Sequence, residues 1–248
     1  MNIFLIVCPL VFLAGFVDAI GGGGGLISLP AYLIAGLPAH QAIATNKLSS
    51  ACGTALTTFR FAKQKLIPWP MAVPAIAAAL AGSWSGAHLS LIMNVEFLTK
   101  ILYVILPVTA FFVLKKDVLK EKSEPAGDSR RTVMISVIIS FVIGMYDGFY
   151  GPGTGTFLII AFSLFAGMDV RSANGLSKAV NLTTNVTSLL VYLHSGQVMI
   201  TLGLAAASCN MAGNWLGSGM AVRAGTRITR PVILCVLALL LIRIIFQP

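Results

Sequence analysis

The stretch DAIGGGGGLISLP, Asp18 to Pro30, places five consecutive glycines shortly after an aspartate. The residues on both sides of it are almost entirely apolar. Glycine readily adopts backbone conformations that end a helix, whereas aspartate is normally found in contact with water. The sequence therefore predicts a helix that is interrupted at the glycines, beside a carboxylate in apolar surroundings.

The composition is that of a membrane protein. Of the 248 residues, 57% are hydrophobic and 10% are charged, and the mean hydropathy is +0.90. Soluble domains carry about 25% charged residues, and a helix needs roughly 20 apolar residues to cross a bilayer. Apolar stretches of nearly that length recur along the chain: Asn2 to Ile20, Pro70 to Met93, Phe97 to Leu114, Thr132 to Phe149, Val198 to Val222 and Pro231 to Phe246. We therefore expect an all-α polytopic membrane protein.

The rest of the composition disfavours several classes of function. The formal net charge is +9, but the basic residues lie mainly in short connections, as in the cytoplasmic loops of membrane proteins, so no nucleic-acid partner is expected. The four cysteines and three histidines are scattered without the spacing of a metal site, and the sequence contains no nucleotide-binding motif. We expect no metal, no cofactor and no catalytic residue.

The glycine stretch occurs twice. GFVDAIGGGG in the first half aligns with GMYDGFYGPG in the second, so that Asp18 corresponds to Asp147. Farther along, TNKLSS aligns with LSKAVN, which sets Lys47 against Lys178, and AGSWSGA aligns with AGNWLGS. The chain thus contains two copies of one unit.

We divide the chain into a first transmembrane repeat (1–114), a polar linker expected in the cytoplasm (115–131) and a second transmembrane repeat (132–248). Each repeat is predicted to contain five helical segments, which gives roughly 8–10 transmembrane helices. The tryptophans of the aligned AGSWSGA and AGNWLGS motifs, Trp84 and Trp215, are expected to be packing residues. The glycines around them are expected to form small-residue helix contacts.

The charges of equivalent loops predict how the repeats are oriented. The connection Arg60 to Lys65 carries three basic residues, and its counterpart Val191 to Gly196 carries none. For the next connection the order is reversed, because His88 to Glu96 has no lysine or arginine while Arg223 to Arg230 contains three arginines. Basic loops stay in the cytoplasm, so the repeats should be inverted, with the N-terminus outside. Inverted repeats are typical of secondary transporters.

Each glycine break is followed by a segment too short to span a membrane comfortably, Leu26 to Gly36 and Thr156 to Gly167. A helix that restarts inside the membrane exposes N–H groups with partial positive charge, which suit an anion. The alternative is a flexible turn that lets two helices pack closely. Because the break recurs in both halves, we predict that these residues contact a small anionic substrate: Gly22, Gly23, Gly24, Gly25, Gly151, Gly153 and Thr154.

The next segment of each half carries polar residues at helical spacing, from Lys47 to Thr57 and from Lys178 to Ser188. A polar stripe on an apolar helix should face the bundle interior or a wet cavity. The alternatives are interhelical hydrogen bonds at the distal Thr57 and Ser188, and lysines that extend to the membrane surface. We predict further substrate contacts here: Asn46, Lys47, Ser50, Thr54, Ser177, Lys178, Asn181 and Asn185.

The two aspartates have two interpretations. Asp18 and Asp147 could accept hydrogen bonds from the glycine-loop amides or pair with a lysine, which would be a structural role. They could instead couple transport to protons, because burial disfavours the charged form of a carboxyl group. The sequence leaves both interpretations open.

The two glycine motifs, with the Asn-Lys and Ser-Lys pairs that follow them, resemble the sulfite exporter TauE/SafE family, also called the toluene-sulfonate uptake permease family. The resemblance covers nearly the whole chain. It implies a multi-pass secondary transporter in the bacterial inner membrane, whose partners are the lipid bilayer and a small anion such as sulfite or an organosulfonate. A homodimer is a further expectation.

Three functions compete at this point. The first is an anion transporter driven by protons or by the membrane potential, and its rival is an anion channel with a continuous pore. The third, a membrane enzyme, is disfavoured because no nucleophile–base pair stands out in the sequence. Counterflow distinguishes the first two, since a preloaded anion accelerates uptake through a carrier and not through an open pore.

Overall fold

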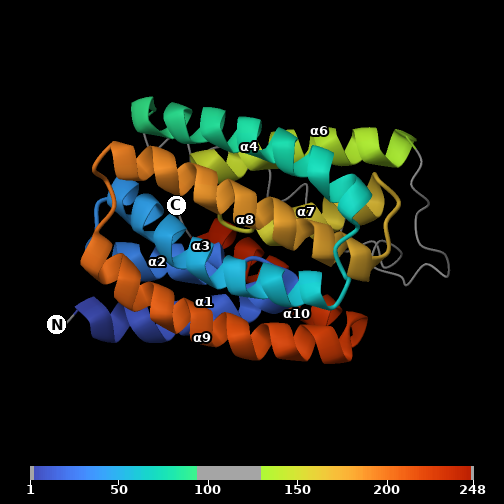
Figure 1. Ribbon diagram of the computed structural model, residues 1–248. Coiled ribbons are helices and arrows are strands. Elements are labelled where there is room, and N and C mark those ends of the chain that lie inside the picture. The colour runs from blue at the N-terminus through green and yellow to red at the C-terminus, as the bar shows by residue number, and fades with distance from the viewer. Residues whose placement is uncertain (1–2, 94–129, 247–248) are drawn as a thin grey trace.

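The computed structural model describes residues 3–93 and 130–246, and within these ranges the chain forms nine helices and no strand. The helices are α1 (Ile3–Gly21), α2 (Gly25–Ile34), α3 (Ala39–Lys63), α4 (Trp69–Ile92), α6 (Arg130–Phe149), α7 (Thr154–Leu164), α8 (Val170–His194), α9 (Ile200–Ala224) and α10 (Thr226–Phe246) (Figure 1). The all-helical prediction is therefore confirmed. The expected span Phe97 to Leu114 and linker residues 115–129 lie outside the described residues.

Helix lengths fit a membrane protein. In the described part of the chain α1, α4 and α6 are long and apolar enough to cross a membrane. Helices α3, α8 and α9 each have 25 residues, or about 37 Å at 1.5 Å per residue, which exceeds the hydrocarbon thickness of about 30 Å. Their lower hydropathy reflects polar side chains that are buried inside the bundle, such as Asn181 and Asn214. The chain is a multi-pass membrane protein.

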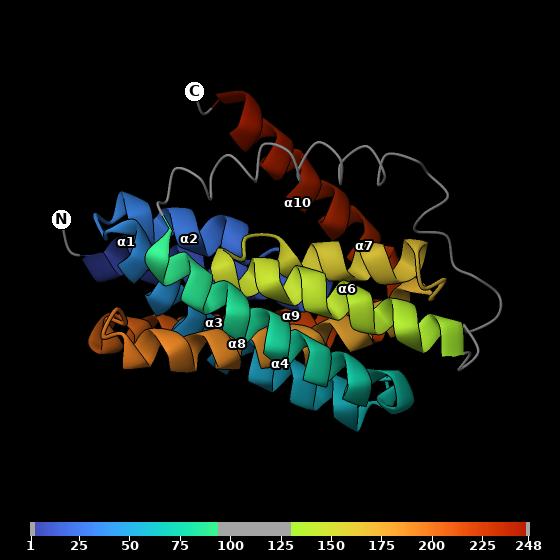
Figure 2. The same cartoon turned by 90° about the horizontal axis from the view of Figure 1, so that it is seen from above.

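The long helices of the bundle run in two opposite directions. Helices α1, α3 and α9 run one way, and α4, α6 and α8 run the other way (Figure 1). The start of α3 meets the start of α9, where the Met199 amide donates to Thr45 Oγ1 over 3.1 Å. The ends of the same two helices also meet, where Arg60 donates to Ser218 Oγ over 2.9 Å. Figure 2 shows that α10 leaves the bundle obliquely.

Glycines bring helices of the two halves into direct contact. Gly82 and Gly86 of α4 lie against the backbone of α6, and Gly213 and Gly217 of α9 lie against the backbone of α1. A Cβ atom at any of these four positions would overlap main-chain atoms of the neighbouring helix. The predicted small-residue contacts are confirmed, and they join the first half to the second.

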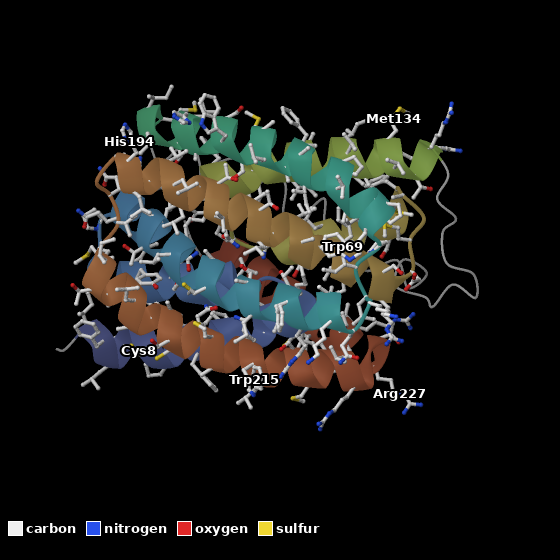
Figure 3. The ribbon with its side chains drawn as sticks, viewed as in Figure 1. Cys8, Trp69, Met134, His194, Trp215 and Arg227 are labelled. Atoms are coloured by element: carbon white, nitrogen blue, oxygen red, sulfur yellow. The ribbon has the colours of Figure 1, made fainter. Side chains whose placement is uncertain are left out.

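The tryptophans between these glycines do not pack in the interior, so that prediction is wrong. Trp84 is 55% exposed and Trp215 is 57% exposed, because the glycine face of each helix is turned to its neighbour. Figure 3 shows Trp215 on the outer side of α9. Each ring has one close polar neighbour. The guanidinium carbon of Arg60 lies 4.0 Å from the ring centre of Trp215, and the His88 ring lies 4.2 Å from that of Trp84.

Basic side chains gather at one end of the bundle. Figure 3 shows Arg227 at the opposite end from His194. The end of α3, the starts of α6, α8 and α10, and the end of α9 all lie at the end of Arg227 (Figure 1). These segments carry the other exposed or half-buried lysines and arginines whose side chains the structure describes: Arg60, Lys63, Lys65, Arg130, Arg131, Arg171, Arg223 and Arg230. Two of them, Arg130 and Arg131, were expected in the linker and instead begin α6.

Candidate functional site

The glycine runs interrupt both helices as predicted. The chain leaves α1 at Gly21 and enters α2 at Gly25, and it leaves α6 at Phe149 and enters α7 at Thr154. The backbone φ angle is positive at both breaks, 76° at Gly22 and 93° at Gly151. Only glycine adopts such angles without strain, so the breaks are fixed by residue type. The short helices begin one or two residues earlier than the sequence suggested.

The two breaks lie directly against each other. A Cβ atom on Gly22 would overlap the backbone of Gly155 and Thr156, and one on Gly25 would lie 3.2 Å from the Cα atom of Pro152. Thr156 Oγ1 also donates to the main-chain oxygen of Gly21 over 2.9 Å. The first residues of α2 and α7 therefore meet between the two halves of the chain.

A small cavity of about 20 Å³ lies at this meeting point. That volume holds a water molecule or a small ion. The cavity is lined by residues from both halves: Asp18, Gly23, Gly24, Gly25, Asn46, Lys47, Ser50, Asp147, Gly151, Gly153, Thr154, Gly155, Asn181, Asn185 and Asn210. Most of the residues proposed from the sequence are thus brought together in one place.

Four of the proposed residues do not line the cavity. Gly22 packs on Gly155, as described. Thr54 Oγ1 donates to the main-chain oxygen of Ser50 over 2.7 Å, and Ser177 Oγ donates to that of Gly155 over 3.1 Å. The fourth is Lys178, whose amine is engaged elsewhere. The sequence reasoning also missed two lining residues, Gly155 and Asn210.

Lys47 and Asp147 form a buried ion pair across the two halves. The Lys47 Nζ atom lies 2.8 Å from Asp147 Oδ2, and both side chains are almost inaccessible to solvent. Asp147 Oδ1 accepts a hydrogen bond of 2.7 Å from Thr154 Oγ1, at the start of α7. A buried charge needs such a partner and such hydrogen bonds. The alternative in which Lys47 extends to the membrane surface is wrong.

Lys178 makes the reciprocal contact with different atoms. Its Nζ donates to the main-chain oxygen of Asp18, and the Lys178 side chain is fully buried, so it does not reach the membrane surface either. The Asp18 carboxylate instead accepts from the Gly24 amide over 3.2 Å, at the start of α2. Each lysine therefore reaches the aspartate segment of the other half, but only Lys47 contacts the carboxylate.

The distal ends of the polar stripes form interhelical hydrogen bonds. Thr57 Oγ1 donates to Asn214 Oδ1 over 2.6 Å, and the hydroxyl oxygens of Ser188 and Ser83 lie 2.8 Å apart. For these two positions the interhelical alternative is confirmed.

The charged side chains that line the cavity are Asp18, Asp147 and Lys47, and the buried Lys178 lies close by. The formal charges of Lys47, Lys178, Asp18 and Asp147 cancel. The N-termini of α2 and α7, which both point at the cavity, add partial positive charge. Amide side chains from three helices, among them Asn46, add polar atoms that can donate hydrogen bonds.

Comparisons with known proteins agree with this architecture. The chain matches the family described as "Sulfite exporter TauE/SafE" over residues 7–244. It is 34% identical over 239 residues to "Probable membrane transporter protein ORF9" of Sinorhizobium sp, an alignment that covers 96% of this chain and 90% of the relative. It is 31% identical over 238 residues to "Probable membrane transporter protein YfcA" of Escherichia coli K12, which covers 95% and 87%.

A relative in Haemophilus influenzae, also named "Probable membrane transporter protein", is 30% identical over 223 residues. No solved structure matches the chain. The family is one of transporters and not of enzymes, and the match spans both glycine breaks and both buried lysines. The protein therefore belongs to the sulfite exporter TauE/SafE family of membrane transporters.

Proposed function

We propose that this protein is a secondary transporter that moves a small anion, such as sulfite, an organosulfonate or a related sulfur oxyanion, across the bacterial inner membrane. The observation that carries the proposal is the cavity, where the starts of two interrupted helices meet the buried Lys47. Helix N-termini and a lysine favour negative charge, and the family to which the chain belongs is described as one of sulfite exporters. The proposed substrate contacts are the residues predicted from the sequence to contact the anion that also line the cavity, Asp18 and Asp147 excepted.

We propose further that residues 1–114 and 132–248 are inverted repeats. Helices α1, α3 and α4 run opposite to their counterparts α6, α8 and α9, which supports this proposal (Figure 1). In a cysteine-free background, single cysteines at Gln64 and Gln197 should react with a membrane-impermeant reagent from opposite sides of the membrane. Reaction of both from the same side would contradict the inversion.

We propose that Asp147 couples transport to protons through its ion pair with Lys47. Protonation of the Asp147 carboxylate would remove the partner of Lys47 and leave the lysine charge for an anion. Loss of the proton would restore the ion pair and release the anion. In this mechanism Asp147 binds the proton and Lys47 binds the anion. The distance of 2.8 Å between Lys47 Nζ and Asp147 Oδ2 supports it. Asp18, whose carboxylate accepts from the Gly24 amide, is the second proposed coupling residue.

Counterflow tests the transport proposal. Purified protein is reconstituted in liposomes loaded with unlabelled sulfite, and the uptake of labelled sulfite is measured. A carrier should show faster uptake into loaded than into empty liposomes, and Lys47→Met should abolish the difference. Equal uptake into both would favour a channel, and no uptake of sulfite, sulfate, thiosulfate or methanesulfonate would overturn the proposal. The expected homodimer is checked separately by the mass of the detergent-solubilised complex.

A further inference from the structure

Two asparagines, Asn210 and Asn214, lie one turn apart on α9 at the edge of the cavity. They are 4% and 0% exposed, and Asn210 lines the cavity while Asn214 lies behind it. The equivalent residues of the first half are Ala79 and Ser83. The pair is therefore a feature of one half alone.

The contacts of Asn214 fix which way the Asn210 amide faces. The Nδ2 atom of Asn214 lies 3.0 Å from the main-chain oxygen of Asn210, and a carbonyl oxygen can only accept. That atom must therefore be the nitrogen. The same nitrogen lies 2.7 Å from the Asn210 side chain, so the atom that it meets there is the acceptor Oδ1. The remaining atom of the Asn210 amide is the donor Nδ2.

Thr57 holds Asn214 in this orientation. Its hydroxyl donates to Asn214 Oδ1 over 2.6 Å, so Thr57, Asn214 and Asn210 form a chain of donors that ends at the cavity. The chain has little room to rearrange, because a Cβ atom on Gly53 of α3 would overlap both amides. On the other side, a Cβ atom on Gly15 of α1 would lie 2.9 Å from Asn214 Nδ2.

In two other asparagines of the cavity the side-chain oxygen is likewise occupied by a hydrogen bond. Asn181 Oδ1 accepts from Asn185 Nδ2 over 3.3 Å, and Asn46 Oδ1 accepts from Ser50 Oγ at 3.5 Å. Within residues 3–93 and 130–246, no hydrogen bond uses the Nδ2 atoms of Asn46, Asn181 or Asn210. Three amide groups thus have their acceptors occupied and their donors left over, around one small cavity.

We infer that Asn210 is a substrate-contacting, specificity-determining residue whose Nδ2 donates to an oxygen of the transported anion, and that Asn214 and Thr57 position it. The inference rests on the proposed function and narrows it. A ring of amide donors suits an oxyanion with several unprotonated oxygens, each of which accepts a hydrogen bond from a different helix. Asn46 and Asn181 supply the neighbouring donors.

The contact is tested by calorimetric titration of the purified full-length protein with sulfite. Asn210→Ala places at this position the residue that the first half carries, and it should weaken sulfite binding at least about tenfold, since a donor to a charged group is removed. Lys47→Met serves as the reference for loss of the site. Sulfite affinity equal to wild type in Asn210→Ala, with loss of binding in Lys47→Met, would overturn the inference and leave the proposed function standing.

The positioning role is tested at a distance from the cavity, in variants that keep Asn210. Thr57→Val keeps the shape and removes the donor, so the Asn214 amide loses its anchor, and sulfite affinity should fall about three- to tenfold. Thr57→Ser keeps the hydroxyl and should bind as wild type does. The matched control is Ser188→Ala, which breaks the equivalent interhelical contact of the other half and should leave affinity unchanged.

The outcomes distinguish a positioning role of Thr57 from a role in helix packing alone. An equal loss of affinity in Thr57→Val and Ser188→Ala would show that both residues act only through helix packing, and would overturn the positioning role. If Asn210→Ala does not fold, the contrast between Thr57→Val and Thr57→Ser still decides the question. Absence of binding of sulfite, sulfate, thiosulfate and methanesulfonate to the wild-type protein would overturn the proposed function and this inference together.

Discussion

The two halves of this transporter share a scaffold and differ in what they contribute to the cavity. Equivalent glycines make equivalent contacts, as at Gly82 on α6 and Gly213 on α1. The first half supplies Lys47, whose amine pairs with a carboxylate, whereas Lys178 of the second half contacts a main-chain oxygen. The second half also supplies Asn210, where the first has alanine. The two halves therefore share their packing contacts and differ in the residues that line the cavity.

The largest effect is expected where the two breaks touch. Gly22→Ala introduces strain of roughly 1–3 kcal/mol at a positive φ, and its Cβ atom would also overlap the backbone of Gly155. Gly153→Ala introduces similar strain, but its Cβ atom would lie 3.2 Å from the ring of Phe157, which can shift. We expect Gly22→Ala not to accumulate, and Gly153→Ala to fold with a lower Tm. Equal yields and equal Tm values in detergent would contradict this difference between the breaks.

Replacement of Lys47 should cost more stability and more sulfite binding than replacement of Lys178. Lys47→Met leaves the Asp147 carboxylate buried without its partner, which costs about 3–5 kcal/mol, and it removes the charge at the cavity. Lys178→Met removes one hydrogen bond from the main-chain oxygen of Asp18, which still accepts from the Gly22 amide over 2.9 Å, at a cost of about 1.5–3 kcal/mol. Thermal unfolding and sulfite titration should both rank Lys47→Met as the more damaging change.

The double variant Lys47→Met/Asp147→Asn separates stability from binding. It removes both charges of the pair, so the Tm should recover toward wild type, while sulfite binding should stay lost. Recovery of binding together with the Tm would mean that Lys47 acts through structure alone.

The aspartates should differ in proton coupling. Asp147→Asn keeps the shape of the side chain and removes the charge that pairs with Lys47, so uptake driven by a pH gradient should be lost while sulfite counterflow persists. Asp18→Asn should have a smaller effect on coupling, because its carboxylate contacts the Gly24 amide and no lysine amine. Proteoliposomes with and without a pH gradient measure both quantities. Wild-type accumulation by both variants would exclude coupling through these residues.

The smallest effect is expected at the outer faces. Arg60 lies over Trp215 and donates to its main-chain oxygen over 2.6 Å, whereas the equivalent position of the other half is Val191. Arg60→Leu should lower stability by about 1 kcal/mol without changing sulfite affinity. Titration and thermal unfolding of the same preparation check this, and a change in affinity would mean that the outer face communicates with the cavity.

Much of the site could be predicted from the sequence because it is repeated. Comparison of the two glycine runs located both breaks, and the aligned lysines located the polar helices α3 and α8. The repeat also limited the prediction. Asn210 was missed because its counterpart is Ala79, so no second copy drew attention to it. A polar residue in the middle of an apolar helix was the signal that was available.

Other features depend on contacts between the halves, which no local pattern encodes. The sequence placed Lys47 and Lys178 near helix starts, where a lysine can reach the membrane surface. Burial follows only from the neighbouring half, which surrounds each lysine. The same applies to Trp84, whose surroundings depend on which face of α4 its glycines turn toward α6. At the first break the positive φ angles fall on Gly22 and Gly23 and not on Gly24, whose φ is −53°. Which of the five consecutive glycines adopt a positive φ angle depends on the packing of Gly22 against Gly155.

The crossed lysine contacts also have a consequence for biosynthesis. When the first half has been translated and inserted, the acceptor of Lys47 is a residue of α6 that the ribosome has not yet made. The glycine face of α4 likewise has no partner until α6 has been made. The glycine face of α9 packs on α1, which was inserted first. Neither half can bury its own cation. We therefore expect the two halves to depend on each other, so that as separate chains they accumulate only when both are present in the same cell.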